Sequence, residues 1–440
     1  MKEVKPMVNA KAKKSAADLL VFMENSPTAV HAVAECLSRL QQGGFKELDE
    51  RTPWAVNPGG RYLIKRHESA LIAVRMGSRN PAEKGLHVIG AHTDSPGFRL
   101  KPNALYNQAG YAQLGVEIYG GPLLASWTDR DLGLAGRAVV SDTKRNLTVR
   151  WLKLDRPIVR IAQLPIHMNR EVNDQGLVLN KQEHLAPILG LSNQKLSPAY
   201  LKNLIADTLS VEPAAIVDWE MELYDTQKPV FAGAEDEFIF GARIDNLAMC
   251  HAALCALLDC PETSERTRMI VFYDSEEVGS TTANGADSSF LSSVLTRLMG
   301  AFSGNPEDFF RATARSFFIS ADAVHAVHPN YLDKYEKEHH CFLNRGPVIK
   351  VNALRKYATT AESSAFFSEL CRRAGVPFQK YVNRTDMAGG STIGPVNASR
   401  LGMATVDVGN AMLSMHSIRE MAGTIDQLSM IKVFKQFFKE

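Results

Sequence analysis

Residues 86–96 have the sequence LHVIGAHTDSP, in which a short apolar run ends in a cluster of polar side chains. Such a run, rich in Leu, Val and Ile and bounded by Gly and polar residues, is typical of a buried β-strand. In an open α/β sheet, ligands gather beyond the carboxyl ends of the strands. The stretch therefore predicts a central strand at 86–91, followed by the first side chains of a binding site.

The segments on both sides of this strand predict an α/β fold. Before it, helices are expected at 16–24 and 27–40 and strands at 61–64 and 70–75. Beyond residue 238, helix and strand patterns alternate, with helices at 246–258, 288–299, 361–374 and 422–438 and strands at 269–273, 317–321, 347–351 and 403–408. Such alternation predicts a mostly parallel sheet flanked by helices.

The segment 95–237 has a different texture, because short alternating or apolar runs at 137–140, 148–154 and 158–164 indicate strands. A chain of 440 residues is also longer than one compact domain usually is. We therefore expect a β-rich domain at 95–237, inserted into a discontinuous α/β domain formed by 1–94 and 238–440.

The overall composition excludes several classes of protein. Lys plus Arg (50) nearly balance Asp plus Glu (48), so no net charge would attract nucleic acid or anionic lipid. No apolar run is long enough to span a membrane, and the Lys-rich start lacks a signal-peptide core. The six cysteines form no CxxC pair and are expected to be reduced. We expect a soluble, cytoplasmic protein without nucleic-acid or membrane partners.

Five polar clusters follow predicted strands, and each contains an acidic or imidazole side chain. They hold His92 with Asp94, Asp245, the pair Glu276 and Glu277, Asp322 with His325, and His416. Taken singly, each has an ordinary explanation as an N-cap, a solvated turn or a structural histidine. Together they supply five metal ligands and a spare glutamate, which suits a pair of divalent cations about 3.5–4 Å apart. Imidazole and carboxylate without thiolate favour zinc, with manganese or cobalt as alternatives.

Longer sequence blocks around these clusters resemble the M18 family of metallo-aminopeptidases, most closely its aspartyl aminopeptidase branch. The resemblance covers nearly the whole chain. The blocks are AHTDSPGFRLKP (91–102), DRDLGLAGR (129–137), LPIHMNR (164–170), FGARIDNL (240–247), EEVGS (276–280), DAVHAVHPNY (322–331), RGPVIKVN (345–352), GSTIGP (390–395) and MHSIREM (415–421). Several long blocks in the correct order are far more specific than a single short motif.

The resemblance implies a zinc-peptidase-like fold and roles for individual residues. Two zinc ions would bind to each subunit, and Asp245 would bridge them. The metal ligands would be His92, Asp245, Glu277, Asp322 and His416. Glu276 would be the general base, and Asp94 would orient His92. Lys350 would neutralise an N-terminal Asp or Glu of the peptide substrate, and His325 would contact substrate or support the site. His167 would reach a neighbouring subunit's active site, because family members form dodecamers.

Two other functions are compatible with parts of this pattern. A carboxypeptidase or deacylase could share the fold and metals, but the EEVGS and GPVIKVN context resembles the aminopeptidases. A non-enzymatic assembly or cargo protein could retain the fold, but it would not need the spare glutamate, Glu276. The sequence therefore favours a hydrolase that removes N-terminal residues from peptides.

Overall fold

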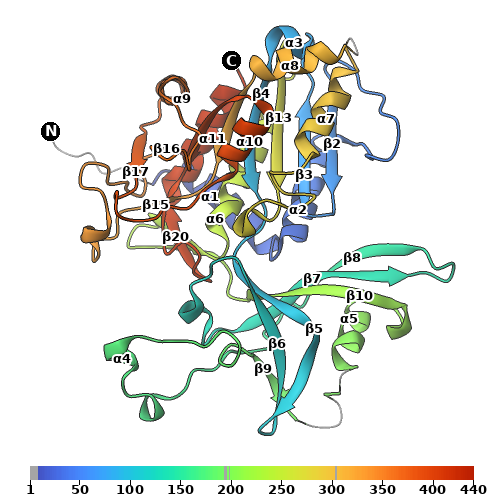
Figure 1. Cartoon of the computed structure of the whole chain (residues 1–440), viewed down its shortest axis with the longest axis vertical. Helices are drawn as coiled ribbons and strands as arrows, with labels where there is room; N and C mark the ends of the chain where they lie inside the picture. Colours follow the sequence, from blue (N-terminus) through green and yellow to red (C-terminus); the bar gives the residue numbers. More distant parts are fainter. Residues whose placement is uncertain (1–7, 193–195, 198, 303–304) are drawn as a thin grey trace. The chain divides into compact units, whose positions relative to one another are not determined.

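The computed structural model describes residues 8–192, 196–197, 199–302 and 305–440, and in it the chain forms two units (Figure 1). The first unit comprises the residues up to Asp94, Pro229–Met415 and Glu420–Glu440. The second comprises Ser95–Lys228 and His416–Arg419. Within the described residues the first unit contains two sheets and the second contains one, and each unit has its own hydrophobic core.

The first unit is an α/β layer structure built on a mixed sheet. Within the described residues the strand order is β1-β2-β3-β13-β4-β14-β18-β16-β17. These strands are β1 (Lys46–Glu47), β2 (Arg61–Arg66), β3 (Ala70–Arg75), β4 (Leu86–His92), β13 (Thr267–Tyr273), β14 (Phe317–Ala321), β16 (Val348–Val351), β17 (Gln379–Val382) and β18 (Ala404–Gly409). The central run from β13 to β18 is parallel, whereas the pairs β2–β3, β3–β13 and β16–β18 are antiparallel. The α/β class is as predicted.

Helices cover both faces of this sheet. One face packs against α1 (Ala10–Asn25), α2 (Ala29–Gln42), α6 (Ile244–Leu258), α9 (Ala361–Arg373) and α11 (Thr424–Phe437). The other packs against α7 (Phe290–Met299), α8 (Pro306–Ala314) and α10 (Ile393–Leu401), with α3 (Pro81–Lys84) against α8. In β4, Leu86 and Val88 join one core while Ile89 and Ala91 join the other. Burial on both faces explains why this strand is an unbroken apolar run.

A smaller sheet in the same unit lies next to several of the predicted site residues. Its described order is β11-β12-β20-β19-β15, with β11 (Val230–Ala232), β12 (Phe238–Gly241), β15 (Val324–His325), β19 (Ala411–Leu413) and β20 (Glu420–Gly423). Because β11 pairs with β12, the first unit resumes at Pro229, earlier than the boundary predicted at 238.

The second unit is an antiparallel sheet with one longer helix, α5 (Tyr200–Leu209). Within the described residues the order is β8-β7-β10-β5-β6-β9, with β5 (Gly97–Gln108), β6 (Tyr111–Tyr119), β7 (Leu132–Ser141), β8 (Leu147–Lys153), β9 (Ile188–Leu191) and β10 (Ile216–Asp225). The segment 158–164 was expected to form a strand but does not, because Val159, Arg160 and Ile161 form only isolated bridges.

The lengths and hydropathy of the helices bear on whether any segment of the chain could span a membrane. Among the described residues, no helix combines the length and the apolar character that crossing a bilayer requires.

Candidate metal centre

His92 is the last residue of β4 and lies at the carboxyl end of the central strand. Its side chain is buried, and its Nδ1 lies 3.0 Å from the backbone oxygen of Asp94 and 3.4 Å from that residue's carboxylate. An imidazole whose Nδ1 is held in this way directs Nε2 outward from the strand. The predicted orientation of His92 by Asp94 thus has a geometric basis, through the backbone oxygen more closely than through the carboxylate.

The Asp94 carboxylate also holds the loop that bears the two glutamates. It accepts hydrogen bonds from the backbone amides of Glu276 at 3.2 Å and Glu277 at 3.1 Å. These glutamates begin the short 3-10 helix η4 (Glu276–Val278), which follows β13 after Ser275 in a left-handed conformation (φ 65°). Since β13 pairs in parallel with β4, with Tyr273 opposite His92, the glutamates emerge beside the histidine.

Asp245 stands at the start of α6, in backbone that is not yet helical. Its backbone amide donates to a carboxylate oxygen of Glu420 on β20 at 3.1 Å. The next residue, Asn246, donates from its side-chain amide to the backbone oxygen of Ala321 at 2.8 Å. Because Ala321 ends β14, this bond ties the start of α6 to the strand that precedes Asp322.

Asp322 follows β14 and contacts two basic side chains. One carboxylate oxygen lies 3.4 Å from Nε2 of His92, and the other accepts a hydrogen bond from Nζ of Lys350 at 2.8 Å. Lys350 belongs to β16 and is buried, with its ammonium 5.5 Å from the ring centre of Tyr357. The lysine is therefore directed into the protein and toward the carboxylate cluster.

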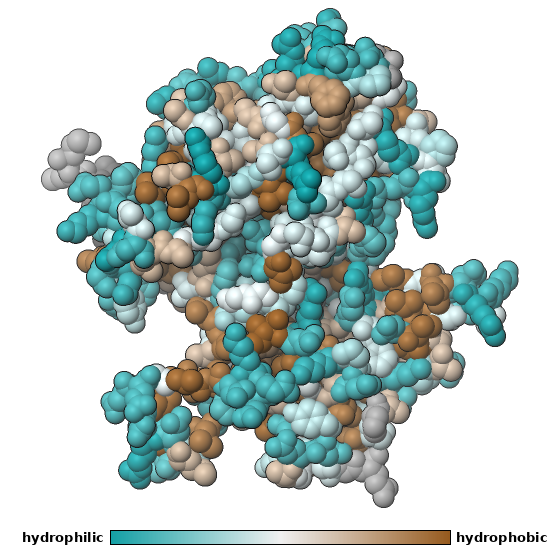
Figure 2. Space-filling model, viewed as in Figure 1, coloured by the Kyte–Doolittle hydropathy of each residue, from teal (hydrophilic) through white to brown (hydrophobic). Residues whose placement is uncertain are grey.

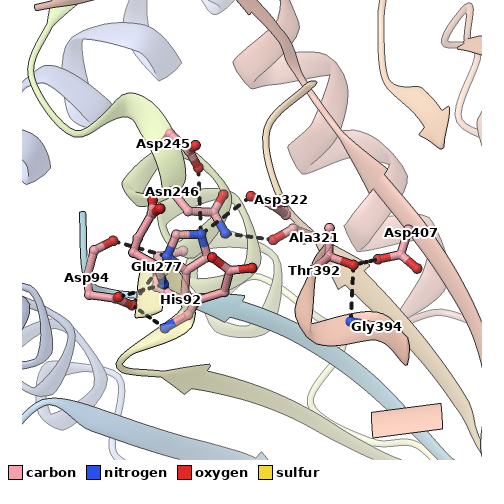
Figure 3. A network of polar contacts seen from close by, with 12 residues as sticks. His92, Asp94, Asp245, Asn246, Glu277, Ala321, Asp322, Thr392, Gly394 and Asp407 are labelled. Carbon is pink, nitrogen blue, oxygen red and sulfur yellow. Dashed lines mark hydrogen bonds and ion pairs between the residues drawn. The ribbon is translucent and has the colours of Figure 1, made fainter. Parts of the chain in front are cut away.

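These side chains converge around Nε2 of His92, as Figure 3 shows for Asp245 and Asp322. The Asp245 carboxylate lies 3.6 Å from Nε2. Donor atoms of His92, Asp245 and Asp322 all lie within 4.8 Å of one another, and so do those of His92, Glu276 and Glu277. One imidazole and several carboxylates at these separations are a donor set suited to divalent cations such as zinc.

The electrostatics of this cluster also favour bound cations. Burial raises the pKa of Glu276, helped by Asp322, Asp94 and Asp245, although His92 opposes it. Burial would likewise raise the pKa of Asp322, but Lys350 and His92 outweigh it and hold that pKa well below its usual range. Several carboxylates in a dry site repel one another, and a divalent cation among them removes that repulsion.

The remaining predicted residues are three histidines. His325, on β15, is exposed and lines a pocket of about 170 Å³ together with Lys334, Tyr335 and Tyr381. His167 lies in the 3-10 helix η2 (Ile166–Met168) of the second unit and is exposed. His416 also belongs to the second unit, where its Nδ1 lies 3.1 Å from the backbone oxygen of Gly121. The roles that the sequence suggests for these three histidines remain predictions.

Three buried residues of the centre were missed by the sequence reasoning. Asn246 and Glu420 fix the backbone around Asp245, and Cys250 donates from Sγ to the backbone oxygen of His92 at 3.0 Å. A usable signal existed for the first two, because both are polar residues inside the quoted blocks FGARIDNL and MHSIREM. Cys250 gives no such signal, since its thiol lies in an apolar helical run.

Comparison with known proteins identifies a matching family. The family described as aminopeptidase I zinc metalloprotease (M18) matches residues 22–438. A protein of Stutzerimonas stutzeri named probable M18 family aminopeptidase 2 is 46% identical over 424 residues, covering 96% of this chain and 97% of that protein.

Two solved structures are similar in fold along nearly the whole chain. A chain of the cryo-EM structure of the Ape4 and Nbr1 complex superposes with a TM-score of 0.95 at 36% identity, covering 99% of this chain and 88% of that chain. A chain of the mApe1 dodecamer of S. cerevisiae superposes with a TM-score of 0.85 at 30% identity, covering 98% of this chain and 97% of that chain. Both similarities extend through the first and the second unit.

Proposed function

This chain belongs to the M18 family of metallo-aminopeptidases, and we propose that it uses two divalent cations to remove an N-terminal Asp or Glu from peptides. The observation that supports a two-cation centre most is the convergence of imidazole and carboxylate groups from four separate elements. His92 ends β4, Glu276 and Glu277 begin η4, Asp245 begins α6, and Asp322 follows β14.

We assign the ligands as the sequence predicted them. His92, Asp245, Glu277, Asp322 and His416 would hold two zinc ions per subunit, with Asp245 as the bridge, and manganese or cobalt could replace zinc. The distances from His92 Nε2 to Asp245 and Asp322 support the assignment of these three residues. The assignment of Glu277 is supported by its donor atom, which lies within 4.8 Å of a donor atom of His92. The assignment of His416 rests on the family resemblance.

The protein's own groups account for the proton transfers of peptide hydrolysis. Cations bound at this centre would activate a water molecule and polarise the scissile carbonyl. Glu276 is then the general base, because it is the glutamate of the cluster that is not assigned as a ligand, and burial raises its pKa and makes it a stronger proton acceptor than an exposed glutamate. The same carboxyl group, once protonated, delivers the proton to the leaving amine. Asp94 keeps Glu276 in place through the backbone amide of that residue.

Lys350 supplies the acidic preference in this proposal. Its ammonium is buried beside Asp322, where no solvent competes strongly with a second carboxylate. The carboxylate of an N-terminal Asp or Glu would bond to a hydrogen of Nζ that Asp322 does not use, since an ammonium has three donors. A neutral side chain in the same position would leave that donor without a partner.

A homo-oligomer, in this case a dodecamer, is proposed on two grounds. A structural relative is described as a dodecamer. In the second unit, β8 also exposes a row of apolar side chains, namely Leu147, Val149 and Trp151. Figure 2 shows a brown, hydrophobic surface over this strand. An exposed apolar row of this kind marks an interaction surface. Assembly would bring His167 to a neighbouring active site, while His325 would contact substrate within its own subunit.

Removal and restoration of metal tests the proposed function. The purified chain is dialysed against a chelator and assayed with Asp-, Glu- and Leu-anilides before and after addition of Zn²⁺, Mn²⁺ or Co²⁺. We expect activity to disappear on removal and to return with about two cations per chain, with Asp and Glu substrates preferred. Full activity in metal-free protein would refute the proposal, and equal activity on all three substrates would refute the acidic preference.

A further inference from the structure

A second group of metal-binding side chains lies within the first unit, on the part of α6 beyond Asp245. It consists of Asp18 on α1 and of His251 and Cys255 on α6, and we call it the outer cluster. The helices α1 and α6 pack side by side (Figure 1). His251 and Cys255 are four residues apart, so their side chains lie on the same face of the helix.

The three donor atoms form a small triangle. The distance from Asp18 Oδ2 to His251 Nε2 is 2.8 Å, from Cys255 Sγ to the same Nε2 is 3.6 Å, and from Sγ to Oδ2 is 3.9 Å. Tetrahedral zinc, with bonds of about 2.0 Å to nitrogen or oxygen and about 2.3 Å to sulfur, separates its ligands by roughly 3.3–3.6 Å. A cation would therefore fit after shifts of about half an ångström in the side chains.

The outer cluster is open on one side and favours positive charge. His251 is fully buried, whereas the Asp18 side chain is 47% exposed, and Cys255 is the one cysteine of the six, all within the described residues, that is not buried. The hydrogen bond from His251 lowers the pKa of Asp18 to about 2 against the effect of burial. Burial disfavours a charged His251, but Cys255 and Asp18 outweigh it and raise its pKa to about 9.

Two other side chains determine how strongly a cation can bind here. Arg39 donates to both oxygens of Asp18 at 3.0 Å and already balances its charge. The side-chain nitrogen of Gln427 lies 2.8 Å from Nδ1 of His251 and donates to the backbone oxygen of Ala248 at 2.9 Å. A cation on Nε2 leaves the ring proton on Nδ1, so Gln427 must turn its oxygen toward the ring. The cluster is thus satisfied without a cation, and binding is reversible.

We propose that Asp18, His251 and Cys255 bind one thiophilic divalent cation, such as Zn²⁺, Cd²⁺ or Co²⁺, at a site separate from the catalytic centre. On binding, the Cys255 thiol and the protonated Nε2 of His251 each lose a proton to solvent, and the sulfur joins Nε2 and a carboxylate oxygen as ligands. Water fills the fourth position on the exposed side. The proposal is independent of the catalytic assignments, because the two sets share no residue.

Cobalt gives a readout that separates the two sites. A thiolate bound to Co²⁺ produces a near-ultraviolet charge-transfer band, and none of the proposed catalytic ligands is a cysteine. We expect metal-free full-length protein titrated with Co²⁺ to show this band, and Cys255→Ser to lose it together with one cation per chain. Asp18→Asn should weaken the affinity for Co²⁺, measured from the band, by about tenfold or more. Even a residue that only hydrogen-bonds to a metal ligand contributes 10- to 100-fold to metal affinity.

A matched control and a second measurement keep the test decisive. Cys341→Ser removes a thiol elsewhere in the first unit and should leave the band intact. Zn²⁺ should also slow alkylation of Cys255 by iodoacetamide at least tenfold, measured by peptide mass spectrometry on the unmodified sequence. Peptidase activity of Cys255→Ser should stay within about twofold of the parent. A band that persists in Cys255→Ser, no band in the parent, or alkylation unaffected by Zn²⁺ would overturn the proposal.

Discussion

The helix α6 takes part in two clusters of potential metal ligands that differ in how their charges are balanced. At its start, Asp245 joins several other carboxylates around buried His92, with Lys350 as a nearby cation. Further along the same helix, His251 meets a single carboxylate, Asp18, whose charge is already matched by Arg39.

This difference indicates which cluster depends on metal. Burying several like charges is costly unless cations compensate them, so the centre around His92 is expected to need its cations for order as well as for catalysis. In the outer cluster the Asp18 side chain is half exposed and already bonded to Arg39 and His251, so its ion pairs contribute little and a cation there is optional. Four substitutions test or sharpen this contrast.

The largest effect is expected from Glu276→Gln. Amide in place of carboxylate removes the general base, whose contribution is typically 10²- to 10⁴-fold in kcat, while size and the backbone bond to Asp94 remain. Steady-state kinetics should show that loss, and metal analysis should show about two cations per chain. If the cations are lost along with activity, Glu276 is a ligand instead, and the division of roles between Glu276 and Glu277 is wrong.

Lys350→Met should reduce activity selectively. A charge-assisted hydrogen bond contributes about 1.5–3 kcal/mol, so kcat/KM for Asp- and Glu-anilides should fall by roughly 10- to 150-fold while that for Leu-anilide changes little. Lys350→Arg is the control that keeps the positive charge. Because Lys350 also bonds to Asp322, metal content is measured in parallel. An equal loss on all substrates, with metal retained, would exclude Lys350 as the specificity determinant.

Asp94→Asn should weaken metal binding without removing a ligand. The Asp94 carboxylate accepts from two backbone amides, and an asparagine side chain has only one acceptor oxygen for them. Loss of such support typically costs 10- to 100-fold in metal affinity. Chelator competition monitored by activity measures the change. An affinity equal to that of the parent would mean that the glutamate loop is held by other contacts.

The smallest effect is expected in the outer cluster, from Asp18→Asn in metal-free protein. The pKa of Asp18 is lowered to about 2 from 3.8, so its charge stabilises the folded state above pH 4 and loses that effect as the pH falls toward 2. His251, Arg39 and Cys255 are the groups that face it. Because the Asp18 side chain is 47% exposed, we expect the substitution to lower the free energy of unfolding by only about 0.5–1 kcal/mol.

Thermal unfolding measures this last difference. The melting temperature of Asp18→Asn should lie slightly below that of the parent at pH 6, and the two should approach each other at pH 3. A large difference that persists at pH 3 would show that Asp18 stabilises the helix packing through something other than its charge.

Comparison of sequence with structure shows which local features were predictable. The strand at 86–91 and the helices at 246–258 and 361–374 were predicted within a few residues, because apolar periodicity reflects which faces are buried. The polar residues at the ends of β4 and β14 were also predictable, because strand ends meet at one edge of a sheet.

The sequence by itself thus determined the α/β class and the family, and it predicted a set of side chains for the metal centre. Tertiary structure alone decided how these side chains are held, through the backbone amide of Glu276 that donates to Asp94 and the bond from Lys350 to Asp322. It also decided that the first unit resumes at Pro229. It also brought Asp18 to His251, which lies 233 residues away in the chain. Local periodicity carries no information about such pairs, because contacts between distant segments depend on how whole helices and strands pack.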